Sequence, residues 1–93
     1  MRYHATKKFL VARNNEGKFF ALDEGPATTS PYTVDHPAFA KHITPYDPAE
    51  LENPKPAEYY FENSTRMRSW LKGFEMVVVE IEYTATVLSQ GEG

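Results

Sequence analysis

The chain has 93 residues, no cysteine, a formal net charge of −3 and a sequence pI of about 5.5. A chain of this length is expected to form one domain that buries roughly two-thirds of its unfolded surface. The lack of cysteine excludes disulfides, thiolate zinc sites and cysteine nucleophiles. No apolar run approaches the ~20 residues of a membrane helix, and residues 1–20 contain no signal-peptide core, so we expect a cytoplasmic protein.

The charge is unevenly distributed along the chain. Residues 1–22 carry five basic residues and one acidic residue, a net charge of +4, whereas residues 23–62 carry eight acids and two lysines, a net charge of −6. Residues 63–93 carry three basic and four acidic residues, a net charge of −1. Proteins that bind duplexes usually have a basic pI, so nucleic-acid binding is not expected. The acidic middle instead favours docking on a basic protein surface.

Residues 1–23 are predicted to form a β-hairpin. Phe9 and Val11 in the first run, and Phe20 and Leu22 in the second, alternate with more polar positions. The Asn-Asn-Glu-Gly stretch at residues 14–17 has turn composition, and its glycine suits a left-handed conformation.

Residues 24–60 contain all seven prolines and are called here the proline-rich segment. Proline cannot donate to a β-ladder, so a central strand is not expected. Its interspersed large residues favour an ordered segment over disorder. These are Tyr32, Val34, Phe39, Ile43, Tyr46, Leu51, Tyr59 and Tyr60.

Two short helices are predicted inside this segment. The first follows Asp35-His36-Pro37 and runs to about His42, with Phe39 and Ile43 facing inward. The second follows Asp47-Pro48-Ala49-Glu50, where aspartate is a good N-cap and proline suits the first helical position.

Residues 61–88 are predicted to form an amphipathic helix followed by a long strand. Asn63 or Ser64 can cap the helix, and Gly73 can end it. The helical stripe consists of Met67, Trp70, Leu71 and Phe74, at i, i+3, i+4 and i+7. From Glu75 the period changes to two, and the apolar face consists of Val77, Val79, Ile81, Tyr83, Ala85 and Val87. We therefore predict an α+β fold: a small antiparallel sheet, made by the hairpin and this strand, packed on one main helix. Residues 89–93 are expected to form a tail.

The long strand has two further consequences. Residues 76–79 are apolar on both faces, so one face needs the helix and the other needs the proline-rich segment or a second subunit. The strand is also longer than usual, so part of it should overhang the hairpin. An unpaired edge of this kind favours a homodimer through the C-terminal strand, or strand addition to a partner.

The order of these elements resembles that of small bacteriophage accessory proteins. The resemblance rests on Phe9-Leu10-Val11 and Gly17-Lys18-Phe19-Phe20 in the hairpin, Trp70-Leu71-Lys72 at the helix end, and the strand Val77-Val78-Val79-Glu80-Ile81-Glu82. Such proteins act on their hosts, and some inhibit defence systems. The resemblance therefore implies a host protein as the partner.

No pattern in the chain predicts catalysis or a cofactor. His36 and His42 would lie on different sides of a helix, so no metal site is expected. Glu80 and Glu82 share a strand face, but no lysine or arginine follows Lys72, so the carboxylate–lysine element of a metal-dependent nuclease is missing. No serine lies in a nucleophile elbow and no glycine-rich loop can hold phosphates. We expect a protein that is not an enzyme and has no cofactor.

Two binding functions remain. In the first, the proline-rich segment contacts and inhibits a host protein, with aromatic anchors among Tyr32, Phe39 and Tyr46 and with Glu50 and Glu52 steering association. In the second, the chain sequesters a small phosphorylated ligand such as a cyclic nucleotide, held at the helix start by Tyr59, Tyr60, Arg66 and Arg68.

Overall fold

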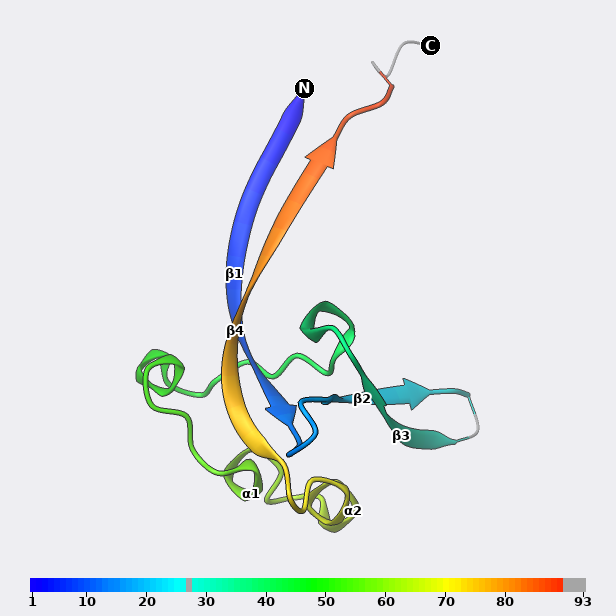
Figure 1. Ribbon diagram of the computed structural model, residues 1–93, viewed down its shortest axis with the longest axis vertical. Coiled ribbons are helices and arrows are strands. Elements are labelled where there is room, and N and C mark those ends of the chain that lie inside the picture. The colour runs from blue at the N-terminus through cyan, green and yellow to red at the C-terminus, as the bar shows by residue number, and fades with distance from the viewer. Residues whose placement is uncertain (27, 90–93) are drawn as a thin grey trace.

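The computed structural model describes residues 1–26 and 28–89, and all four of its strands belong to one antiparallel sheet (Figure 1). Its strands are arranged in the order β3-β2-β1-β4, with short helical turns in the connection between β3 and β4. The elements in chain order are β1 (Arg2–Arg13), β2 (Phe19–Glu24), β3 (Thr29–Val34), the 3-10 helices η1 (Pro37–Phe39) and η2 (Pro48–Leu51), α1 (Ala57–Tyr60), α2 (Thr65–Trp70) and β4 (Glu75–Thr86).

The prediction of an α+β fold built on one main helix is wrong. The predicted caps are present: the Ser64 hydroxyl accepts a hydrogen bond from the Met67 N–H at 3.2 Å, and Gly73 has φ of 88°. However, α2 ends at Trp70 and has only six residues. A helix this short gains little from its own hydrogen bonds and presents too little surface to cover a sheet. The long β1–β4 ladder is instead the main organising element.

The predicted helical stripe nevertheless enters the core. Leu71 is buried with Ala12, Phe20 and Ala57, and Met67, Trp70 and Phe74 pack against this cluster. A second cluster joins Leu10, Ile43 and Tyr60. Both clusters lie around the lower half of β1 and β4, where the short helices gather (Figure 1).

The pairing of β1 differs from the predicted hairpin. All twelve residues of β1 pair with β4, from Arg2 opposite Thr86 to Arg13 opposite Glu75. The register of β1 with β2 is the single pair of Arg13 and Phe19. The hairpin turn exists, but β2 leaves it in a different direction from β4 (Figure 1). In the lower half of this ladder, apolar residues lie opposite each other from Phe9–Val79 to Ala12–Met76.

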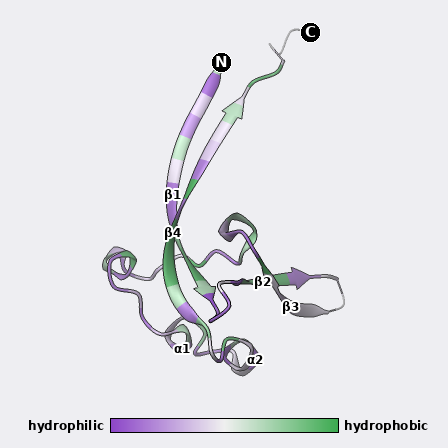
Figure 2. Cartoon of the chain, viewed as in Figure 1, coloured by the Kyte–Doolittle hydropathy of each residue, from purple (hydrophilic) through white to green (hydrophobic). Residues whose placement is uncertain are grey.

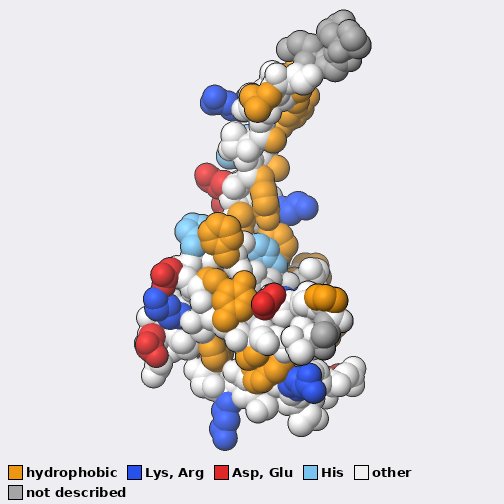
Figure 3. Space-filling view, turned by 90° about the vertical axis from the view of Figure 1, so that its right-hand side faces the viewer, with side chains coloured by type: hydrophobic (Ala, Val, Ile, Leu, Met, Phe, Trp, Pro, Cys, Tyr) orange, Lys and Arg blue, Asp and Glu red, His pale blue; other side chains and the backbone are white. Residues whose placement is uncertain are grey.

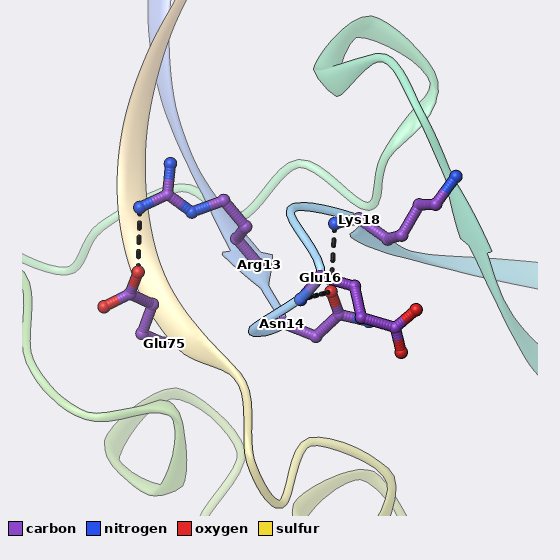
Figure 4. Close-up of polar contacts among 5 residues, drawn as sticks. All are labelled: Arg13, Asn14, Glu16, Lys18 and Glu75. Atoms are coloured by element: carbon purple, nitrogen blue, oxygen red, sulfur yellow. Dashed lines mark hydrogen bonds and ion pairs between the residues drawn. The ribbon is translucent and has the colours of Figure 1, made fainter.

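The turn itself has the predicted chemistry. Gly17 has φ of 79°, and the Asn14 side-chain oxygen accepts hydrogen bonds from the N–H groups of Glu16 at 3.0 Å and Lys18 at 2.9 Å. Just before the turn, Arg13 forms a 2.8 Å ion pair with Glu75 across the β1–β4 ladder (Figure 4).

The proline-rich segment contains a strand that the proline argument did not predict. β3 includes Pro31 and lies at the edge of the sheet, where a residue without an N–H can be accommodated. The two helical starts lie where expected, but both are 3-10 turns. His36, not Asp35, caps η1 through a 3.0 Å bond from the Ala38 N–H. Asp47 caps η2 through a 2.9 Å bond from the Ala49 N–H.

The upper halves of β1 and β4 form a two-stranded arm, defined here as residues 2–8 and 80–86. The arm projects away from the remaining elements, and the molecule measures 51 × 36 × 26 Å (Figure 1). Hydropathy changes along β4 from an apolar base to a mixed outer half (Figure 2). The predicted overhang of β4 beyond the hairpin is wrong, because β1 is equally long and pairs with β4 along its whole length.

Candidate functional site

The three predicted aromatic anchors lie on different elements and are all exposed. Tyr32 lies on β3, Phe39 ends η1, and Tyr46 precedes η2. Phe39 is 72% exposed, so it does not face inward as its helical position suggested, and its ring contacts that of His36 at 5.8 Å between centroids. Ile43 is buried as expected and bridges to Leu10 of β1.

Tyr46 belongs to a cluster of three tyrosines. Its ring centroid lies 5.7 Å from that of Tyr59 in an edge-to-face contact and 6.0 Å from that of Tyr60 in a stacked contact. Tyr59 and Tyr60 also meet edge to face, at 5.2 Å. Tyr60 is buried, whereas Tyr46 remains 69% exposed. An exposed ring is therefore held in place by two neighbours, one of which is part of the core.

Glu50 lies beside this cluster and is only 4% exposed. Its Oε1 atom has no hydrogen-bond partner among the described residues. Glu50 also lines an open hollow of about 340 Å³ together with Asp47, Ala49, Asn53, Lys55 and Tyr59. The predicted steering role needs an exposed acid, which Glu52 is and Glu50 is not. The Glu50 carboxyl group is therefore hidden beside the tyrosine cluster.

Burial, with a smaller contribution from the neighbouring acids, raises the pKa of both Tyr59 and Tyr60. Burial raises the pKa of Tyr60 to about 12, and the adjacent Glu50 carboxylate adds to this increase, although a 3.3 Å bond from the Lys55 N–H opposes it. Burial also raises the pKa of Tyr59, with smaller contributions from Glu50 and Asp47. Both hydroxyls stay protonated at neutral pH. The cluster is a hydrogen-bonding aromatic surface beside negative charge.

The residues predicted to hold a phosphorylated ligand are not gathered at one site. Arg68 donates to the Glu62 carbonyl at 2.7 Å and to the Thr65 hydroxyl at 3.3 Å. Arg66 lies over the Trp70 ring at 5.9 Å. Arg66 lines an open hollow of about 490 Å³ with Gly25, Pro26, Thr28, Thr29 and Ser30, whereas Tyr59 lines the acidic hollow beside Glu50.

Neither a cluster of metal-ligating side chains nor a membrane-spanning helix occurs among the described residues. Within residues 1–26 and 28–89, no three His, Asp or Glu side chains gather in a geometry that could hold a metal ion. His42 instead stacks on Phe9 with centroids 4.4 Å apart, and its Nε2 lies 3.0 Å from the Pro37 carbonyl oxygen. In the same part of the chain, no helix has the length and apolar character needed to cross a bilayer.

Comparison of the chain with protein-family models, with curated proteins and with solved structures finds no match.

Two surface features escaped the sequence argument. One is the burial of Glu50, for which an isolated acid in a polar turn gives no signal. The other is the pair of exposed tyrosines on the arm, Tyr3 and Tyr83. The alternation in residues 77–87 placed Tyr83 on an apolar face. That Tyr3 lies near it on the same face follows only from the pairing of β1 with β4. Sequence patterns indicated the second feature only in part.

Proposed function

We propose that this chain is a non-enzymatic binding protein whose proline-rich segment contacts a basic surface of another protein. The observation that supports it is the exposed Tyr46 ring, held against Tyr59 and Tyr60 beside the buried carboxylate of Glu50. In this interface Tyr46 is the anchor, and the acidic hollow receives a lysine or arginine side chain of the partner.

The packing of Tyr46 suits an anchor. Two ring contacts already restrict its side chain, so less rotamer freedom is lost on binding. Tyrosines are common among the residues that dominate interface energies. A ring of this size also offers a large apolar contact and a hydroxyl in one side chain.

The hollow beside Tyr59 suits a cation. Asp47 and Glu50 contribute carboxylates, and the faces of tyrosine rings attract ammonium and guanidinium groups. Lys55 lines the same hollow, but among the described residues it forms no ion pair. A basic side chain of a partner would bind the exposed Asp47 carboxylate and lie near the buried Glu50, whose Oε1 has no hydrogen-bond partner among the described residues.

Further exposed residues extend the proposed surface. Phe39 and Tyr32 supply additional apolar contacts, and Glu52 speeds association with a basic partner through long-range attraction. The resemblance to bacteriophage accessory proteins suggests the source of the partner: a host protein in the cytoplasm, whose activity the complex inhibits.

The proposal is tested by titrating the isotope-labelled protein with short lysine-rich and arginine-rich peptides. Chemical-shift changes are expected at Tyr46, Asp47, Glu50 and Tyr59, and Tyr46→Ala should weaken binding by roughly tenfold or more. The matched control is Tyr83→Ala, which removes an exposed tyrosine from the arm. Equal loss in both variants, or shifts spread over all acidic residues, would contradict a specific site.

Binding of a small phosphorylated ligand is a second candidate function, and of the residues predicted for it only Arg66 is kept. The hollow beside Arg66 is lined by Thr28, Thr29 and Ser30, so it combines a guanidinium with several hydroxyl groups. Calorimetric titration with cyclic nucleotides tests it: Arg66→Ala should abolish binding, and Arg68→Ala should not. No heat at millimolar ligand would exclude this candidate.

A further inference from the structure

The two faces of the arm differ sharply in chemistry. Residues directly opposite each other in an antiparallel pair share a face. One face therefore carries the pairs Tyr3–Ala85, Ala5–Tyr83 and Lys7–Ile81, and is called here the tyrosine face. The opposite face carries Arg2, His4, Thr6 and Lys8 beside Thr86, Thr84, Glu82 and Glu80. One face is apolar except for Lys7, and the other is polar throughout.

The outer part of the tyrosine face is exposed, whereas Ile81 at its inner end is buried. Tyr3 is 53% exposed and Tyr83 is 42% exposed, and both alanines between them are exposed. Hydrophobic side chains run along one side of the arm and continue into the body (Figure 3). The arm is a two-stranded ribbon whose strands are separated by more than seventy residues of sequence, so no tight turn closes it. Isolated two-stranded ribbons are at best marginally stable in water, so the arm needs a covering partner.

The shape of this face suits a second copy of itself. Tyr3 and Tyr83 lie diagonally, with Ala85 and Ala5 at the other corners. The rings flank an open hollow of about 280 Å³, lined by Tyr3, Ala5, Tyr83, Ala85 and their neighbours His4 and Thr84. Each copy thus has a projecting ring and a receiving hollow on the same surface, which is what a two-fold interface requires. Alternating large and small residues let two such faces interdigitate.

The charges on the arm disfavour a dimer in which β4 pairs with β4, or β1 pairs with β1, of a second copy. Leu10 exchanges both backbone hydrogen bonds with Ile43, so even-numbered residues of β1 point their backbone groups away from β4. Hydrogen-bonded and non-hydrogen-bonded pairs alternate along an antiparallel ladder, so the backbone N–H and C=O groups of Thr84 and Thr86 point away from β1, toward the free edge of β4. A two-fold β4–β4 joint would bring together Glu80 and Glu82 from each copy, and a β1–β1 joint would bring together Arg2, Lys7 and Lys8 from each copy. Like charges of this kind oppose edge pairing.

We propose that the tyrosine face of the arm is a homodimer interface, in which Tyr83 of each protomer enters the hollow of the other. The partner is a second copy because the surface is self-complementary, and because a copy is present whenever the chain folds. The two strands of one arm pack face to face on those of the other, and the two bodies project from this joint.

Sedimentation equilibrium of the full chain over a wide concentration range tests the interface. The wild type should be a dimer, and Tyr83→Glu should raise the dimer dissociation constant by roughly thirtyfold or more, as expected for a buried central aromatic. The matched control is Thr86→Glu, an exposed residue on the polar face that lies opposite Arg2 and does not line the hollow, and it should leave the dimer unchanged. Circular dichroism verifies that each variant is folded.

A second variant tests the hollow without removing the ring. Ala85→Gln keeps both tyrosines but fills the receiving space, so it should also weaken the dimer. A monomeric wild type, equal dimerisation of wild type and Tyr83→Glu, or greater weakening by Thr86→Glu would each overturn the proposal. Assembly that grows beyond a dimer with concentration would indicate open-ended pairing of β1 with β4 of the next copy, and would also overturn it.

Discussion

Replacing Glu50 by glutamine should make the fold more stable while weakening partner binding. Glu50 is 4% exposed, and its Oε1 has no hydrogen-bond partner among the described residues. An unsatisfied buried polar atom costs about 1–3 kcal/mol, and a charged group costs more than a neutral one. Glutamine keeps the shape and one acceptor oxygen, so we expect the free energy of unfolding to rise by about 1–2 kcal/mol.

Urea denaturation measures this change, with Glu52→Gln as the matched control. Glu52 is exposed and two residues away, so its replacement should change stability by no more than about 0.5 kcal/mol. A second readout is the alkaline titration of tyrosinate absorbance. Because Glu50 contributes to the raised pKa of Tyr60, that pKa should fall in Glu50→Gln. A loss of stability of 1 kcal/mol or more would refute the reasoning, since it would mean that the carboxylate is satisfied and stabilising.

Three further predictions concern the fold. Leu71→Ala should cost about 2–5 kcal/mol of unfolding free energy in urea, because Leu71 is buried in one cluster with Ala12, Phe20 and Ala57. A cost below about 1 kcal/mol would mean that Leu71 is not part of the core. The free energy of unfolding should fall as the pH rises from about 10 to about 12, because tyrosine ionises first in the unfolded chain while the pKa of Tyr60 in the folded chain is about 12. Tyr60→Phe should reduce this dependence of stability on pH, and an unchanged dependence would contradict the raised pKa of Tyr60. Gly17→Ala should cost about 1 kcal/mol in thermal unfolding because its φ is 79°, whereas Gly25→Ala serves as a control without a positive φ.

Local signals in the sequence located most turns and caps. Gly17, Ser64 and Gly73 act where their chemistry predicted, and Asp47 caps a helical turn at the expected residue. The stripe formed by Met67, Trp70, Leu71 and Phe74 does pack into the core. These features were predictable because each depends on a few neighbouring residues whose preferences are intrinsic.

The candidate site was predicted less well. Tyr46 is exposed as an anchor requires, yet its contacts with Tyr59 and Tyr60 join residues that the sequence assigned to two different functions. Glu50 is hidden although nothing in residues 47–52 indicates burial. Arg66 and Arg68 each have local contacts that separate them from the tyrosines. Contacts between turns depend on how the segment folds back on the sheet, which periodicity does not encode.

The sequence by itself determined the positions of β2, β4 and the turn at Gly17, and it indicated that one face of β4 is apolar to its end. Only the tertiary structure decided that β1 pairs with β4 along all its residues instead of folding back on β2, and that the short helices do not form a layer. The reason is that strand partners and registers are set by side chains far apart in the chain, whose combined packing outweighs the local preference for a hairpin. That same pairing brings Tyr3 beside Ala85 and Tyr83 beside Ala5, which creates the exposed face of the arm.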